Sequence, residues 1–92
     1  MNLTAIPLQN DQIKFFRVES EGILVHPQKG KVRVLNPTGT FIWDLIDGTT
    51  SINEIINSVD SVYACHSDLL QSEVVHFLKV LSEKSLIYLK EE

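Results

Sequence analysis

The sequence has little of several features that mark common classes of protein. Its only cysteine is Cys65, so an internal disulfide cannot form, which fits a reducing cytosol. No stretch has enough apolar residues to cross a bilayer. The N-terminal residues MNLTAIPLQND lack the basic start and apolar run of a signal peptide. These absences predict a cytoplasmic protein that does not bind a membrane.

Positive charge is also scarce. Eight Lys and Arg stand against twelve Asp and Glu, which gives a formal net charge of −4, and no basic cluster occurs along the chain. Domains that bind DNA are normally basic, because neutralising phosphates supplies most of their affinity. The composition therefore predicts no nucleic-acid partner.

Catalytic and metal-binding motifs are missing as well. His26, His66 and His76 fall in different predicted elements, and none belongs to an HExxH pattern. Cys65 and His66 are neighbours in sequence, and such neighbours rarely converge on one ion. The four glycines occur singly, so there is no glycine-rich phosphate loop. We predict no catalytic residue, no metal and no cofactor.

What is present suits one small folded domain. The chain has 92 residues, of which 43% are hydrophobic. We expect a flexible N-terminal arm over 1–11 and a single domain over 12–92. The turn signals SEG and PQKG separate three segments of strand character, which predicts an antiparallel meander over Ile13–Glu19, Ile23–His26 and Lys31–Leu35.

Three helices are predicted after the strands. Asn36 is a good N-cap before Pro37, and Gly48 supplies a stop. Ser51 and Glu54 form a capping-box pattern. Apolar spacing and these caps place the helices at Pro37–Asp47, Ile52–Val62 and, after Ser67 as N-cap, Asp68–Lys84.

Strands first and helices after predict an α+β fold. Trp43 lies beside the apolar stripe of the first helix, and we expect it in the core or at its edge. The segment LIYL (Leu86–Leu89) is a short apolar run that either packs against the domain or pairs as a final strand.

The third strand is a candidate binding element. Lys31 and Arg33 project from one side of it and alternate with Val32 and Val34. Two interpretations stay open. The charges either protect an exposed sheet edge, or the edge accepts an extended peptide whose acidic residues they attract.

The third helix is apolar over a wider arc than one core face requires. Leu69 and Val80 lie off its main stripe, and Glu73 and Phe77 lie between them and that stripe. The extra apolar residues either pack against LIYL or form one wall of a groove.

The arrangement of these segments resembles the PqqD-like family, also called RiPP recognition elements. Its members carry a leucine-asparagine, a small-residue pair, a helix with a tryptophan-like residue, a D-G stop, a threonine-rich turn and an isoleucine-rich helix. The corresponding segment here is VLNPTGTFIWDLIDGTTSINEII, and FLKVLSEKSLIYL is similar to the family's closing segment. The resemblance covers about Ile13–Leu89.

The resemblance implies a winged-helix-like domain of a three-stranded antiparallel sheet followed by three helices. It implies no catalytic residues. Such domains bind the leader segment of a ribosomally made precursor peptide, which adds as a further strand beside the third helix. Carried over residue by residue, the leader would run along Lys31, Val32, Arg33, Val34 and Leu35 and face Leu69, Glu73, Val74, Phe77 and Val80.

A freestanding domain of this kind is most similar to the leader-binding partner of a lasso-peptide protease. The implied partners are then a precursor peptide, a leader peptidase and a cyclase. The alternative within the family is the peptide chaperone of quinone cofactor biosynthesis, which serves a radical enzyme.

Other functions remain as competing hypotheses. The helix-turn-helix taken at face value is typical of a winged-helix DNA-binding regulator, although the predicted helix at Ile52–Val62 has no Lys or Arg. A dimerising subunit would associate through LIYL or an edge strand. A cysteine enzyme would use Cys65. The sequence leaves the oligomeric state open.

Overall fold

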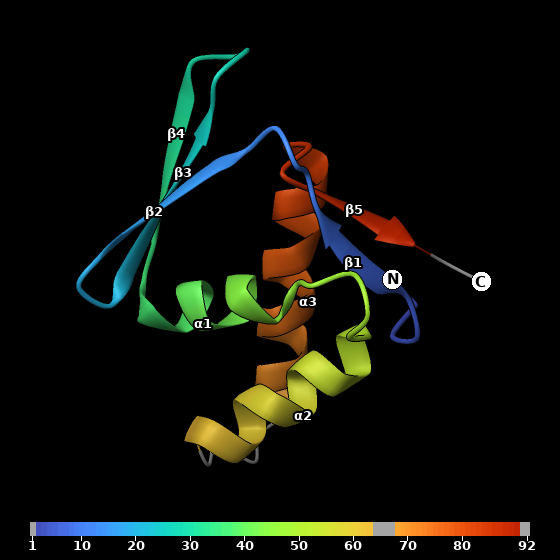
Figure 1. Cartoon of the computed structure of the whole chain (residues 1–92). Coiled ribbons are helices and arrows are strands. Elements are labelled where there is room, and N and C mark those ends of the chain that lie inside the picture. The colour runs from blue at the N-terminus through green and yellow to red at the C-terminus, as the bar shows by residue number, and fades with distance from the viewer. Residues whose placement is uncertain (1, 64–67, 91–92) are drawn as a thin grey trace.

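The structure is a computed structural model that describes residues 2–63 and 68–90, apart from the side chains of residues 68 and 69. Two sheets and three helices build the described part of the chain (Figure 1). In chain order the elements are β1 (Ile6–Gln9), β2 (Lys14–Val18), β3 (Glu21–His26), β4 (Lys31–Leu35), α1 (Pro37–Leu45), α2 (Ile52–Tyr63), α3 (Asp68–Glu83) and β5 (Ile87–Lys90). The predicted α+β order of a three-stranded antiparallel sheet followed by three helices is confirmed.

The three-stranded sheet has the order β2-β3-β4, and both pairings are antiparallel. Its strands match the predicted meander, but β3 begins at Glu21 rather than at Ile23. The reason is Glu19, whose φ of 58° lets the chain reverse within two residues. The turn therefore lies one residue earlier than the SEG motif predicts.

Helix α1 begins as the sequence predicts. The side chain of Asn36 accepts a hydrogen bond of 2.7 Å from the backbone N–H of Gly39, and Pro37 occupies the first turn. The helix ends at Leu45, two residues before the predicted Asp47. Asp47 instead belongs to the loop after α1, where its carboxylate accepts hydrogen bonds from the backbone N–H groups of Thr49 and Thr50. Outside the helix, Gly48 turns the chain with a φ of 82°.

The capping box of α2 is confirmed. The backbone N–H of Ser51 donates to the carboxylate of Glu54 at 3.0 Å, and the N–H of Glu54 donates to the Ser51 hydroxyl at 3.2 Å. Helix α2 ends one residue after the predicted Val62, and α3 ends one residue before the predicted Lys84. Ser67, Cys65 and His66 lie outside the described residues.

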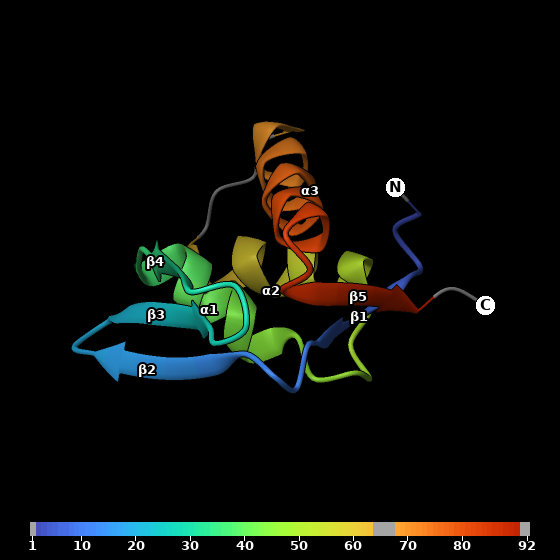
Figure 2. The ribbon, with the colours of Figure 1, turned by 90° about the horizontal axis from the view of Figure 1, so that it is seen from above.

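The N-terminal segment differs from the prediction of a loose arm over residues 1–11. Ile6–Gln9 form strand β1, which pairs antiparallel with β5, so the LIYL segment does form a final strand (Figure 2). Pro7 and Ile87 are buried within this two-stranded sheet. Ala5 adds a tie to α2, because its carbonyl accepts the N–H of Ile52 at 3.0 Å. The arm is therefore part of the fold over residues 6–9.

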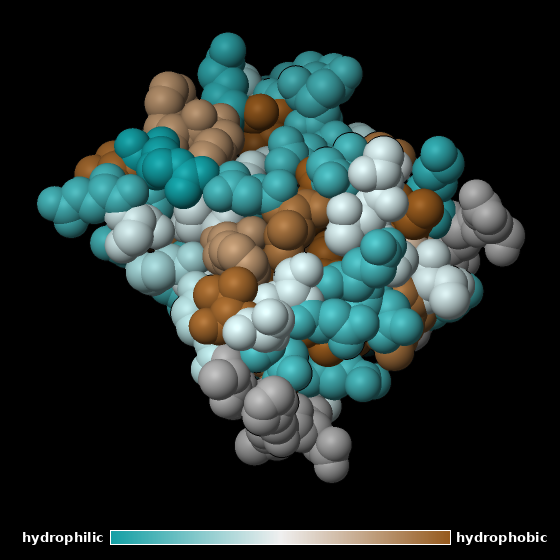
Figure 3. Space-filling view, turned by 60° about the horizontal axis from the view of Figure 1, so that its bottom comes forward, coloured by the Kyte–Doolittle hydropathy of each residue, from teal (hydrophilic) through white to brown (hydrophobic). Residues whose placement is uncertain are grey.

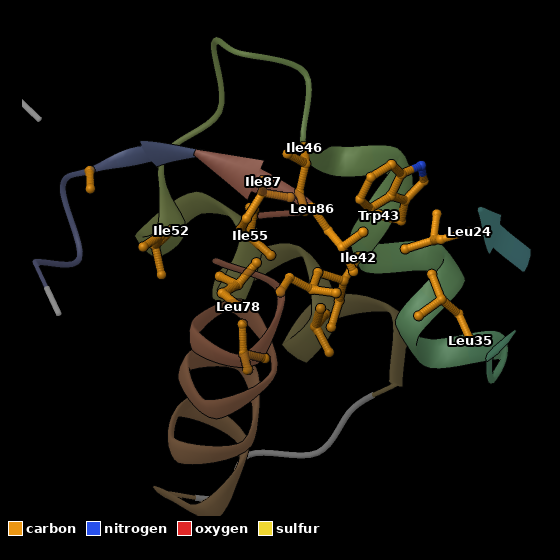
Figure 4. Close-up of a cluster of buried hydrophobic side chains, with 14 residues drawn as sticks. Leu24, Leu35, Ile42, Trp43, Ile46, Ile52, Ile55, Leu78, Leu86 and Ile87 are labelled. Carbon is orange, nitrogen blue, oxygen red and sulfur yellow. The ribbon is translucent and has the colours of Figure 1, made fainter. Parts of the chain in front are cut away.

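The core lies where the helices meet the inner face of the three-stranded sheet and β5. Leu24 and Leu35 of the sheet point toward Ile42 and Trp43 of α1 (Figure 4). Trp43 is 2% exposed and stacks on Phe15 at 6.1 Å between ring centroids, so the prediction that it is a core residue is confirmed. Seen from the α2 side, apolar residues also reach the surface between hydrophilic areas (Figure 3).

Candidate functional site

The edge of β4 is open beside a helix. In the described part of the chain, β4 pairs with β3 on one side and with no strand on the other. An edge strand of this kind presents free N–H and C=O groups. The opposite edge, formed by β2, lies away from α3, whereas β4 lies on the α3 side of the sheet (Figure 2). The β4 edge is thus the one that adjoins the helices.

The side chains of β4 divide between two faces. Val32 and Val34 are 63% and 62% exposed and point away from the core, in register with Val25 and Ile23 of β3. Leu35 is buried, and Arg33 is half-buried, on the inner face. The strand alternation expected from the sequence is therefore present, with the basic residues on the face that meets α3.

A groove lies between β4, the start of α1 and α3, and we call it the β4–α3 groove. Its volume is about 360 Å³. Buried apolar side chains from four elements form much of its lining, and Glu73 contributes a carboxylate from α3. The lining residues are Arg33, Val34, Leu35, Asn36, Thr38, Gly39, Ile42, Val59, Leu70, Glu73, Val74 and Phe77.

Phe77 approaches α1 closely at this groove. A Cβ added at Gly39 would lie 3.2 Å from the Phe77 ring and 3.2 Å from the Asn36 side-chain oxygen. Glycine therefore lets α1 pack near α3 here, and the Gly39 N–H donates to the Asn36 side chain that caps the helix. The first turn of α1 forms part of the groove for this reason.

A second, smaller hollow adjoins the groove. We call it the cationic hollow, and its volume is about 110 Å³. Arg33 lines both spaces. The other residues around the hollow come from β3, the β3–β4 turn, β4 and the end of α3, namely Leu24, His26, Lys29, Lys31, Val32, Lys84 and Leu86.

The structure brings most of the predicted binding residues together. Of the ten, those that line the groove are Arg33, Val34, Leu35, Glu73, Val74 and Phe77. Lys31 and Val32 line the cationic hollow instead. Val80 is half-buried and lines neither space, while β5 packs against α3. The Leu69 side chain lies outside the described residues.

Sequence reasoning missed several lining residues. Leu70 and Val59 belong to the apolar stripes of α3 and α2, which indicate core packing, and the sequence predicts Asn36 only as a helix cap. Ile42 reaches the groove from α1, with Thr38 and Gly39 from its first turn. The sequence signal for Thr38 and Gly39 was their position directly after β4, which places the first turn of α1 beside the open edge of the sheet.

No residue set in the described chain points to metal chemistry. Among residues 2–63 and 70–90, no three His, Cys, Asp or Glu side chains gather closely enough to hold an ion. None of the described helices is long and apolar enough to cross a membrane. What the site offers is an unpaired strand edge beside a groove, and both suit an extended chain with side chains that alternate in direction.

Comparison with known proteins assigns the family. Residues 21–87 match the family model of PqqD, described as coenzyme PQQ synthesis protein D. This match spans more than half of the chain and includes β3, β4 and all three helices. The chain belongs to the PqqD family, which confirms the resemblance seen in the sequence.

The fold is also similar to a solved structure described as TbiB1 in complex with the TbiA(beta) leader peptide. The TM-score is 0.79 at 24% sequence identity, and the alignment covers 87% of this chain and 93% of that chain. Comparison with curated protein sequences gave no match.

Proposed function

We propose that this protein is a peptide chaperone for a ribosomally synthesised precursor peptide. It binds the leader segment as an added strand on β4 and presents it to a leader peptidase or modifying enzyme, of the lasso-peptide type. Membership of the PqqD family supports the class of ligand. The similarity to TbiB1, which was solved with a leader peptide, supports the lasso type.

One observation carries the proposal: the open edge of β4 lies beside the β4–α3 groove. Strand addition gives affinity through main-chain hydrogen bonds, and a neighbouring groove gives specificity because it accepts every second side chain of the peptide. The leader then runs along Lys31–Leu35, and its inward side chains face Glu73, Val74 and Phe77. The extended chain completes the ladder that β4 leaves open.

We propose a supporting rather than a catalytic role for the chain. Its partner is made on ribosomes, so the proposed place of action is the cytoplasm. The acidic composition supports a peptide partner over DNA, because a net charge of −4 repels phosphates.

A surface for the processing enzyme is available on the outer sheet face, which we define as Phe16, Val18, Ile23, Val25, Val32 and Val34. Four of these are large apolar residues that are more than half exposed, among them Phe16 at 52%. Val32 and Val34 belong to the strand that takes the leader. A leader strand would extend this face, so an enzyme docked here would contact chaperone and leader together.

Calorimetric titration tests the central proposal. The ligands are synthetic leader segments of the short reading frames that neighbour the gene, and scrambled peptides of equal composition are the controls. We expect one leader to bind with micromolar or tighter affinity. If every authentic leader binds no better than its scrambled control, the proposed function is wrong.

The enzyme-docking surface needs a separate test. Phe16→Ser combined with Val18→Ser should slow processing of the precursor while leaving leader affinity unchanged, because both residues lie on β2, away from the β4 edge. A folded double variant that supports normal processing would contradict this assignment.

The second candidate is a chaperone for a radical enzyme of quinone cofactor biosynthesis, which the description of the matching family favours. The two candidates differ in the enzyme that the leader-bound chaperone recruits. Purified complex mixed with a leader peptidase or with a radical enzyme from the same locus distinguishes them by sedimentation.

A further inference from the structure

The cationic hollow concentrates the positive charge of an acidic protein. Four of the eight Lys and Arg residues line this one space: Lys29, Lys31, Arg33 and Lys84. Among the described residues that line it, none carries a carboxylate. These basic residues are spread over the β3–β4 turn, β4 and the end of α3, so the fold, and not a run in the sequence, brings them together.

The charges around the hollow are not neutralised by the described part of the chain. Arg17 pairs with Asp44 at 2.7 Å elsewhere in the molecule. Within the described residues, none of the four basic residues of the hollow forms an ion pair. A protein that keeps like charges together without partners loses stability through their repulsion, so a ligand of opposite charge would be favoured there.

Two buried nitrogen atoms around the hollow also have no hydrogen-bond partner among the described residues. His26 is only 6% exposed, and its Nδ1 atom has no hydrogen-bond partner. The Nε atom of Arg33 is likewise buried and unpartnered. Buried polar atoms are normally satisfied, and an orphaned one costs free energy. A carboxylate in the hollow would lie among the lysines and accept charge-assisted hydrogen bonds from them and from the Arg33 guanidinium.

We propose that the cationic hollow binds a carboxylate side chain of the leader peptide while an apolar side chain of the same peptide occupies the β4–α3 groove. This inference rests on the proposed function and specifies the ligand further. Arg33 borders both spaces and joins them into one composite site. The site thereby selects leaders by an acidic residue as well as by an apolar anchor.

Strand geometry fixes the relation between the two anchors. Lys31 lines the hollow and Leu35 lines the groove, and both lie on the inner face of β4, with Arg33 between them. A strand added to β4 places every second side chain on that face. The acidic residue and the apolar anchor must therefore be two or four positions apart in the leader.

A double-mutant cycle tests this pairing. One partner is the Lys29→Gln, Lys84→Gln variant, which removes two charges from the hollow without changing any residue that lines the groove. The matched control is Lys79→Gln combined with Lys90→Gln, which removes the same charge from exposed positions outside both spaces. Circular dichroism verifies that each variant is folded.

The other partner is a set of synthetic leader peptides in which each Asp or Glu is replaced singly by Asn or Gln. Against the unaltered protein, one replacement should weaken binding by about 10-fold, the loss expected for a charge-assisted hydrogen bond. That replacement should have a clearly smaller effect on the hollow variant, which keeps only Lys31 and Arg33 of the four basic residues, and its full effect on the control variant.

Several outcomes would overturn the inference. The hollow has no carboxylate ligand if the leader binds normally but no single replacement weakens it, or if both lysine variants respond alike. The same conclusion follows if inorganic phosphate binds the hollow while every replacement leaves leader affinity unchanged. Failure of all leaders to bind would instead defeat the proposed function itself, and this inference with it.

Discussion

The two sheets of this small protein use their strands in opposite ways. The two-stranded sheet joins the ends of the chain, and it buries Pro7 and Ile87 against the helices. In the three-stranded sheet, no described strand pairs with the outer side of β4, and Val32 and Val34 are exposed. The β1–β5 sheet ties the two terminal segments of the described chain into the core, although it also has free edges and exposes Tyr88, whereas the three-stranded sheet places its free edge beside the β4–α3 groove.

This difference separates stability from binding within 92 residues. A chain of this length has a modest core, so it cannot leave many apolar residues unburied. The pairing of β1 with β5 and the packing of β5 against α3 complete the core, to which β4 contributes Leu35 but not its free edge. The open sheet is then free to serve a partner.

The largest expected effect is on the two-stranded sheet. Ile87→Ala should lower the free energy of unfolding by about 2–5 kcal/mol, because Ile87 is 1% exposed and truncation leaves a cavity. Val34→Thr, which keeps the β-branched shape on the open sheet, should change it by less than about 0.5 kcal/mol. Urea denaturation measures both. Equal losses would show that the open sheet carries as much stability as the two-stranded one.

The comparison also explains what sequence could predict about the fold. Local signals succeeded: Asn36 caps α1, and Ser51 and Glu54 cap each other. The β2-β3-β4 meander followed from its turn residues. Strand β1 was not predicted because its partner β5 lies at the other end of the described chain, so no hairpin turn between the two strands indicates the pairing. A segment with Pro7 at its centre also has weak strand character.

The residues of the candidate site also fall into a group that the sequence predicts and a group that it does not. The resemblance to the PqqD-like family implied the residues of β4 together with Val74 and Phe77, and the alternation along β4 independently indicated its edge as a candidate binding element. The cationic hollow was not predicted, because Lys29 and Lys84 are distant in sequence and only tertiary packing brings them together. Whether Val80 faces a groove depended on how α3 packs, which periodicity alone does not determine.

A pair of proline substitutions tests the open edge directly. Successive residues of β4 direct their N–H groups alternately toward β3 and toward the free edge. Of Arg33→Pro and Val34→Pro, one should break a β3 hydrogen bond and destabilise the fold. The other should stay folded and bind leader about 10-fold more weakly, since it loses an edge donor.

Matched alanine variants isolate the backbone effect of these prolines. Arg33→Ala and Val34→Ala remove the same side chains but keep both N–H groups, and calorimetry compares each with its proline counterpart. A proline variant that remains folded and binds like its alanine control would argue against strand addition.

A smaller effect is expected within the groove. Gly39→Ala adds a methyl group 3.2 Å from the Phe77 ring, so the ring must shift and the groove changes shape. The helix gains about 1 kcal/mol in propensity, which offsets this crowding in the free protein. We expect nearly unchanged stability and about 5-fold weaker leader binding.

Ser61→Ala serves as the control for that variant, because it replaces an exposed residue of α2 that does not line the groove. It should leave leader affinity unchanged. If Gly39→Ala also binds leader normally, this turn of α1 does not contact the peptide.

The smallest expected effect is a pH dependence of stability that comes from Asp47, in the loop between α1 and α2. The Thr49 backbone N–H, together with further hydrogen bonds from Thr49 and Thr50, lowers the pKa of Asp47 from 3.8 to about 2. A carboxyl group whose pKa is lowered by folding stabilises the protein above its unfolded pKa. This contribution is lost as pH falls from about 4 toward about 2.

Asp47→Asn tests that contribution, because an amide oxygen in the place of Oδ1 still accepts from Thr49 and from the Thr50 N–H, whereas the charge and the acceptor at Oδ2 for the Thr50 hydroxyl are lost. The difference in unfolding free energy between the two proteins should be constant near neutral pH and shrink as pH falls through the range between 3.8 and about 2. Leader affinity at neutral pH should be equal for both, since Asp47 does not line the groove. A loss of affinity in Asp47→Asn would mean that the α1–α2 loop, and not only the open sheet, takes part in binding.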